Sequence, residues 1–256
     1  MLYFTATMHY LKRAFSKPIE IALMTLLPVG IIVINVVMNL HIITDVGGEY
    51  MYGGYNIMAT IITILIVLMF QMMSGAYSGE YIFMDMRCDT RWRLRAAPVS
   101  PSVIVFGAIA ASVIFSLLTA CFVFLVTYFA FNVYLGNLVI IAPVVILTAL
   151  TSQFIGIIIA MFVKTVGSIN GIMIVLSFAM SALIGGFMIN IPAPEFIRHH
   201  IIPTGVAFRA IATSSLTPIH GGNYTVNDSL VSLVILVGMS AFFGIATLMI
   251  ARRRPA

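Results

Sequence analysis

The most constraining feature of this sequence is a stretch without charge. From Ala96 to Val163 there is no Asp, Glu, Lys or Arg. A helix needs about 20 apolar residues to cross the hydrocarbon of a bilayer, so this stretch has room for two crossings. The turn-forming residues between Phe131 and Asn137 separate them. Only 8% of the whole chain is charged, against about 25% in soluble domains. The sequence therefore predicts a membrane domain.

Charge-free windows predict six transmembrane helices in one domain that spans residues 1–256. The fold class is all-α, because lipid cannot satisfy the open edge of a sheet. The apolar run after Lys17 is too long for the core of a signal peptide, so we interpret it as a retained first span. The expected spans are Ile21 to His41, Ile57 to Ser78, Val103 to Ala130, Leu138 to Phe162, Ser168 to Asn190 and Ser229 to Ala251.

The distribution of basic residues predicts the orientation of these spans. With the N-terminus inside, eleven of the 13 Lys and Arg residues lie in inner segments, and only Arg198 and Arg209 lie outside. We therefore expect a multi-pass protein of the plasma membrane with both termini in the cytoplasm, in a prokaryotic host. The basic residues gather at membrane borders rather than in a stripe, so we expect no nucleic-acid partner.

The first seventeen residues have the pattern of an interfacial helix. Phe4, Met8, Leu11 and Phe15 recur at helical spacing and share one face, with Lys12 among the polar residues opposite. Such a helix lies on the inner leaflet with membrane lipid as its partner. The alternative is a simple basic flank of the first span.

The inner loop between the second and third expected spans is rich in charge. It has no turn residue between Glu80 and Pro98, so it can form a short helix that Pro98 ends. A charged helix on the cytoplasmic side is a docking surface for a soluble partner; the alternative is a positive topology anchor. The candidate docking residues are Glu80, Arg87, Thr90, Arg91, Trp92, Arg93, Leu94 and Pro98.

This loop resembles the coupling segment of the type-2 ABC exporter permeases. The resemblance rests on an acidic residue that leaves the second span, a Thr in a short charged helix, and a Leu-x-x-x-Pro-Val-Ser entry to the third. The matching positions are Glu80, Thr90, Leu94, Pro98, Val99 and Ser100. The family usually has Gly before the Thr, where this chain has Asp89. The resemblance implies a cytosolic ABC ATPase partner and a second permease copy or paralogue.

A second resemblance lies before the last span. This part of the chain looks like the family's re-entrant outer hairpin. It begins with the small residues Gly185-Gly186, continues through Pro192, and ends in a Pro-led segment near Arg209. The stretch from about His199 to Thr217 is too apolar for a free loop and too short to cross the membrane. Backbone of this kind at membrane depth must be buried against protein. An ordinary outer loop with a surface helix is the alternative.

The chain also lacks several chemical signatures. It has no G-x-x-x-x-G-K-[ST] phosphate loop, so ATP and Mg would be bound by the partner and we expect no cofactor here. We find no catalytic constellation and no metal site, since the side chains of the adjacent His199 and His200 diverge. An intramembrane enzyme and a membrane scaffold or sensor remain as alternatives to a permease.

Polar side chains on the second and fifth spans suggest a path for cargo. The resemblance places these two spans at the dimer axis. The bland alternative is hydrogen bonding between packed helices. No charged residue lies deep in a span, which argues against a proton relay and suits a drug, antimicrobial peptide, lipid-like or saccharide cargo. The candidate path residues are Thr63, Gln71, Ser74, Asn170, Ser177 and Ser181.

Overall fold

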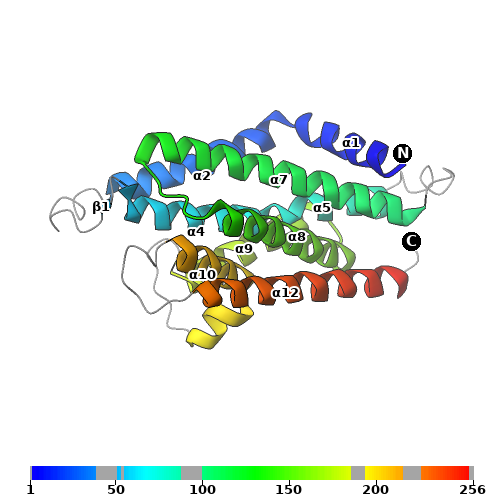
Figure 1. The fold of residues 1–256 in the computed structure, drawn as a ribbon. Helices are drawn as coiled ribbons and strands as arrows, with labels where there is room; N and C mark the ends of the chain where they lie inside the picture. The colour runs from blue at the N-terminus through cyan, green and yellow to red at the C-terminus, as the bar shows by residue number, and fades with distance from the viewer. Residues whose placement is uncertain are drawn as a thin grey trace.

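The structure is an all-helical bundle whose long helices run roughly side by side (Figure 1). This computed structural model describes residues 2–38, 51–52, 55–87, 100–185, 194–215 and 226–253. Within these residues, six helical segments are long and apolar enough to cross a membrane. They confirm the expected all-α class and the number of spans.

The crossing helices begin and end close to the expected positions. They are α2 (Pro18–Met38), α4 (Ile57–Met73) continued by α5 (Gly75–Arg87), α7 (Pro101–Phe131), α8 (Leu138–Phe162), α9 (Val166–Leu183) and α12 (Val226–Arg253). Local sequence explains several starts. Asn56, Asn137 and Thr165 each accept a hydrogen bond from a backbone N–H in the first turn of the helix that follows. At the other end of α7, Asn132 adopts a left-handed conformation that stops the helix.

Two helices differ most from the expected spans. The fifth, α9, ends at Leu183, before the expected Asn190. The helix of the second span runs from Ile57 to Asp85, past the expected end of the span at Ser78. Its single irregularity is a turn at Ser74 between α4 and α5. The structure therefore carries Glu80 and Asp85 on the crossing helix itself rather than on a separate loop helix.

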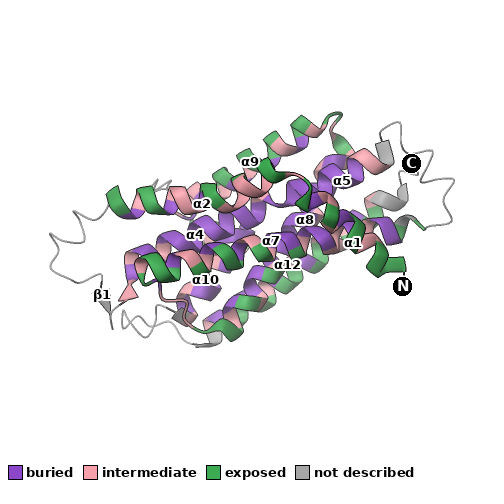
Figure 2. Cartoon of the chain, turned by 90° about the horizontal axis from the view of Figure 1, so that it is seen from above, coloured by how far each residue is buried: buried purple, intermediate pink, exposed green. Residues whose placement is uncertain are grey.

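The helix α4 forms the centre of the bundle. It contacts α2, α7, α8, α9 and α10, and Figure 2 shows it buried along its length. The helices α2, α9 and α12 expose apolar side chains along theirs, such as Leu26, Val175 and Phe242. A surface of this kind fits a lipid environment.

The helix α1 (Leu2–Phe15) confirms the expected N-terminal helix and has two apolar sides. Phe4, Met8 and Phe15 are exposed. Tyr10 and Ala14 are buried against a cluster from α5 and α7. Ala6 sits beside Gly107 of α7, where a Cβ atom would lie only 2.8 Å away. The helix is therefore docked on the bundle as well as amphipathic.

Shorter elements close the end of the bundle opposite to α1. β1 (Met51–Tyr52) and β2 (Tyr55–Asn56) form a two-residue antiparallel pair. η2 (Ile197–Ile201) leads to α10 (Pro203–Ser215), which contacts α4, α8 and α12. Val206, Ala207, Ala210 and Ile211 of α10 are fully buried in the main core. The segment therefore inserts between the spans, as the re-entrant hairpin was expected to do.

Candidate functional site

The candidate site is the end of the second span, where α1, α2 and α5 meet. The segment Ile57–Asp85 has 29 residues, which corresponds to a helix about 44 Å long. The hydrocarbon layer is only about 30 Å thick. A helix of this length along the bilayer normal exceeds the hydrocarbon layer by about 14 Å, and the charged residues Glu80 and Asp85 indicate that the excess lies in α5.

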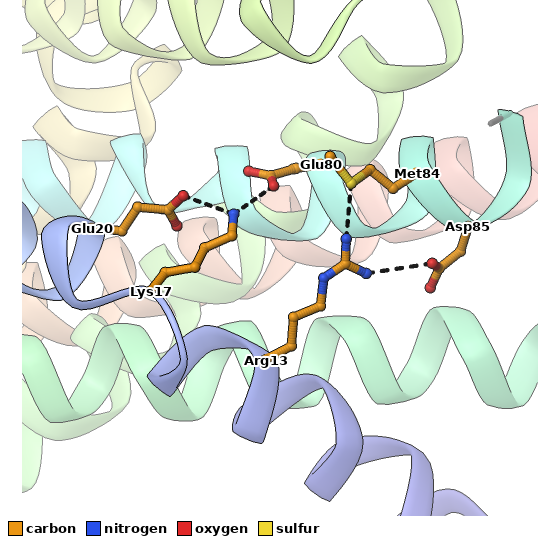
Figure 3. Close-up of polar contacts among 6 residues, drawn as sticks. All are labelled: Arg13, Lys17, Glu20, Glu80, Met84 and Asp85. Atoms are coloured by element: carbon orange, nitrogen blue, oxygen red, sulfur yellow. Dashed lines mark hydrogen bonds and ion pairs between the residues drawn. The ribbon is translucent and has the colours of Figure 1, made fainter. Parts of the chain in front are cut away.

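Glu80 is held by the segment between α1 and α2 (Figure 3). Lys17 Nζ lies 2.6 Å from Glu80 Oε1 and 2.7 Å from Glu20 Oε1. Only 6% of the Glu80 side chain is exposed. Burial lowers the pKa of Lys17, but hydrogen bonds to Glu20 and Glu80 and their charges outweigh it, so the pKa lies above its ordinary value. Lys17 is therefore charged at neutral pH and neutralises a buried carboxylate.

A second set of contacts lies about one helical turn further along α5. Asp85 accepts hydrogen bonds from the Tyr10 hydroxyl and from Arg13 Nη1, the latter at 3.4 Å. The Arg13 guanidinium also lies 2.9 Å from the Met84 sulfur and 5.1 Å from the centre of the Tyr81 ring. Burial and the Asp85 carboxylate raise the pKa of Tyr10 well above its ordinary value, so it remains a donor. These contacts fasten α1 to α5 along more than one turn.

Sequence reasoning missed the partners in this cluster. It assigned Arg13 and Lys17 to the topology signal and Glu80 to a docking surface. The usable signal was the pair Glu80 and Asp85 itself, because carboxylates at a membrane border are costly unless a cation lies within reach. Two cations four residues apart at the end of α1 match that need.

Most of the expected coupling residues follow directly on α5. Arg87 is the last residue of that helix, and its side chain is not described. The remainder fall outside the described residues: Thr90, Arg91, Trp92, Arg93, Leu94 and Pro98. The chain is described again at Ser100, directly before α7 begins at Pro101. The segment is therefore bounded on both sides by helices that contact each other and α1.

The candidate cargo residues of the second span are buried between helices. Gln71 Nε2 donates to the Ser116 carbonyl of α7 at 2.7 Å. Ser74 Oγ donates to the Gln71 carbonyl and accepts from Gln153 Nε2 of α8 at 3.0 Å. Thr63 is fully buried. Gln71, Ser74 and Gln153 therefore form a polar layer between α4, α7 and α8.

On the fifth span, Ser177 and Ser181 are also buried, and Asn170 is half-buried. Ser177 donates to the Met173 carbonyl of its own helix. The buried oxygens Thr63 Oγ1, Gln71 Oε1 and Ser181 Oγ have no hydrogen-bond partner within the part of the chain that the structure describes. Both spans therefore carry buried oxygen atoms that are free to form a further hydrogen bond within the described part of the chain.

The helices α5 and α8 approach each other very closely next to the polar layer, at Gly75 and Gly79 of α5. A Cβ atom on Gly156 would overlap the backbone oxygen of Gly75, and one on Gly79 would lie 2.6 Å from the Gly156 oxygen. Ser78 of α5 donates to the Gln153 carbonyl at 2.9 Å, and Ser152 of α8 donates to the Met72 carbonyl at 2.7 Å. Small residues and hydroxyl groups of this kind are typical of tight helix contacts in membranes.

The family comparison agrees with this architecture. A model of the ABC-2 family transporter proteins matches residues 6–249. The chain belongs to the ABC-2 transporter family. The match covers all six spans and includes α1 from Ala6 onward. Comparison with curated proteins and with solved structures found no match.

Membership in this family identifies the chain as the membrane part of an ABC transporter and implies an ABC ATPase partner. The end of the second span, α5, is held by contacts with both α1 and α8. A displacement of α5 would be shared with α1 through the charged contacts and with α8 through the glycine contact.

Proposed function

We propose that the chain is the permease subunit of an ATP-driven exporter and that α5 transmits the stroke of a separate ATPase. The observation that supports the proposal is that α5 continues as a helix through Glu80 and Asp85 to Arg87, directly before the expected coupling segment of a family member. A continuous helix transmits displacement better than a flexible loop does. The ends of α1 and α12 lie at the same end of the bundle as α5, and both termini are cytoplasmic in this proposal (Figure 1).

In this proposal the partner binds ATP and Mg, and two permease copies, or this chain and a paralogue, complete the transporter. The cargo is a drug, antimicrobial peptide, lipid-like compound or saccharide that leaves a prokaryotic cell across the plasma membrane. The exposed side of α1, with Phe4 and Met8, rests in the inner leaflet. Here Lys12 faces the headgroups, because Arg13 and Lys17 are already paired with carboxylates.

The proposed cargo path follows the polar residues of α4 and α9. Thr63, Gln71 and Ser181 support it, because each holds a buried oxygen that lacks a hydrogen-bond partner within the described ranges. Leaving a buried polar atom unpaired costs about 1–3 kcal/mol. Passage of a polar group of the cargo would supply the missing donors. The path requires α4 to separate from its neighbours, since these residues are buried in the present state.

The decisive experiment changes the coupling segment. Trp92 and Leu94 are apolar residues within a charged stretch, so we expect them to anchor the segment in the ATPase. An anchor at an interface centre contributes about 2 kcal/mol, which corresponds to about thirtyfold in affinity. The double variant Trp92→Asp/Leu94→Asp should release the ATPase or uncouple ATP hydrolysis from transport.

The matched control is Lys164→Asp, which changes charge by the same amount in the short loop between α8 and α9. It should leave ATPase binding within a few-fold of wild type. Binding is measured by co-purification from membranes, and transport by ATP-dependent movement of a panel of exported compounds in vesicles. Wild-type binding and transport by the double variant would contradict the proposed coupling role.

A further inference from the structure

The two basic residues that break the positive-inside pattern come together near the re-entrant hairpin. Arg198 belongs to η2 and Arg209 to α10, at the end of the bundle opposite to α1. Arg209 Nη1 lies 3.1 Å from His200 Nε2, and Arg209 Nη2 lies 3.4 Å from Asp228 Oδ1. One guanidinium therefore joins η2, α10 and the first turn of α12.

The chemistry of this contact decides which tautomer of His200 can make it. A guanidinium carries only donors, so the Nε2 atom of His200 must accept. A histidine that accepts at Nε2 is neutral and carries its proton on Nδ1. The Nδ1 atom is buried and has no partner within the described residues. The ring is further held by stacking on Phe196, with centroids 5.2 Å apart.

Protonation would remove this contact. A doubly protonated imidazole has no lone pair to offer Arg209 and would place a second positive charge 3.1 Å from the guanidinium nitrogen. Histidine is the side chain whose charge ordinarily changes between about pH 5 and 8. The contact between His200 and Arg209 would therefore be broken by acid on the side of the membrane that faces outward in the proposed topology.

Charged groups also surround the neighbouring His199, where burial, and then the charges of Arg209 and Arg198, lower the pKa and Glu195 opposes them. From α12, Asp228 pairs with Arg209. A histidine with a lowered pKa binds its proton less readily when folded than when unfolded, so its stabilising contribution is lost as the pH falls. Acid can therefore also act on this segment through His199, and the His199→Gln variant separates that contribution from the contact of His200 with Arg209.

The contact between α10 and α12 has a second, uncharged support. Thr213 and Ser229 share a hydrogen bond of 2.6 Å. The hydrogen bond of Arg209 to His200 fastens η2, where the close approach of Gly205 to the Arg198 carbonyl adds packing but no charge. Loss of the imidazole contact would free η2 while α10 stays on α12.

We propose that His200, Arg209 and Asp228 form an acid-sensitive latch that holds η2 against the re-entrant helix and opens when the outer solution is acidified. The proposal concerns gating of the hairpin and does not depend on the identity of the cargo or on the ATPase.

The test compares backbone hydrogen exchange of residues 197–213 in the purified full-length chain in lipid nanodiscs. Wild type and variants are compared at the same pH, about 7.5 and then about 5.5, on either side of the range in which imidazole titrates. The variant His200→Gln keeps an acceptor for Arg209 but cannot titrate. At the acidic pH, wild type should exchange about tenfold faster than His200→Gln, the order expected for a lost charge-assisted hydrogen bond. At the higher pH the two should agree.

Two further variants make the result decisive. His199→Gln removes the neighbouring ring but leaves the latch, and should keep the acid response. Arg209→Met removes the guanidinium and should show low protection at both pH values, measured against the intrinsic exchange rate at each pH, without the additional acid-dependent loss of protection that wild type shows. The proposal is overturned if His200→Gln responds to acid as wild type does, or if His199→Gln abolishes the response.

Discussion

Replacement of Gly156 by alanine tests the packing that joins α5 to α8. The new methyl group would overlap the Gly75 backbone oxygen, and it would meet the carbonyl carbon and Cα of the same residue next. The obstacle is main chain on a helix, so it cannot rotate away as a side chain would. The two helices must separate.

The size of the effect follows from what separation would break. Overpacking of a tight interior costs about 1–3 kcal/mol. The hydrogen bonds from Ser78 to the Gln153 carbonyl and from Ser152 to the Met72 carbonyl cross the same interface. Each contributes about 0.6 kcal/mol in a membrane protein. We expect Gly156→Ala to destabilise the permease by about 2–4 kcal/mol.

The assay is thermal denaturation of the purified protein in detergent, followed by loss of monodisperse material. The matched control is Gly171→Ala on α9, where a Cβ atom would meet nothing within 4 Å. Both changes replace glycine by alanine within a membrane helix, so propensity effects are shared. Equal melting temperatures for the two variants would refute the close contact of α5 with α8.

Two further predictions concern the charged cluster and the polar layer. Lys17→Glu should leave the buried Glu80 without a cation, destabilise the docking of α1 by about 3 kcal/mol and weaken coupled transport. Lys17→Glu/Glu80→Lys should restore both, and Lys164→Glu in the loop between α8 and α9 should change neither. Failure of the double exchange to rescue would show that the ion pair does not position α5. Gln71→Leu should change stability by only about 1 kcal/mol, because it removes an unpaired oxygen along with a hydrogen bond, yet it should reduce transport in vesicles; unchanged transport of every exported compound would assign this residue to packing.

The spans were predictable because a membrane span depends on properties of one continuous stretch of sequence. Length and absence of charge decide whether a segment crosses a bilayer, and both are visible in the sequence. The start of α8 at Leu138 agrees to the residue, because Asn137 caps the helix and the turn residues before it end α7. The re-entrant segment was predictable for a similar reason, since its apolar composition and its prolines allow few other placements.

The contacts between segments were not predictable in this way. Lys17, the partner of Glu80, lies 63 positions earlier in the chain. The sequence around Lys17 does not indicate that it pairs with Glu80. The polar face of the second span was visible as a helical alignment, but the alignment does not tell whether it meets water, cargo or another helix. The structure shows Gln71 and Ser74 bonded to α7 and α8.

The helix of the second span continues past the expected end of the span at Ser78, because the first charge marks the end of the apolar segment and not the end of the helix. A charge ends the apolar segment, but it does not end a helix whose backbone remains hydrogen-bonded. Residues 79–87 have no proline and continue as α5. The distinction matters for mechanism: the boundary of the membrane lies within a helix that continues past it, so a force applied near Arg87 enters the bilayer along one rod. That rod is gripped by α1 on one side and by α8 on the other, and its only described irregularity is the turn at Ser74. A stroke delivered to α5 would therefore meet the close backbone contact with α8 at Gly79 and Gly75 before it reached the hydrogen-bonded layer around Gln71.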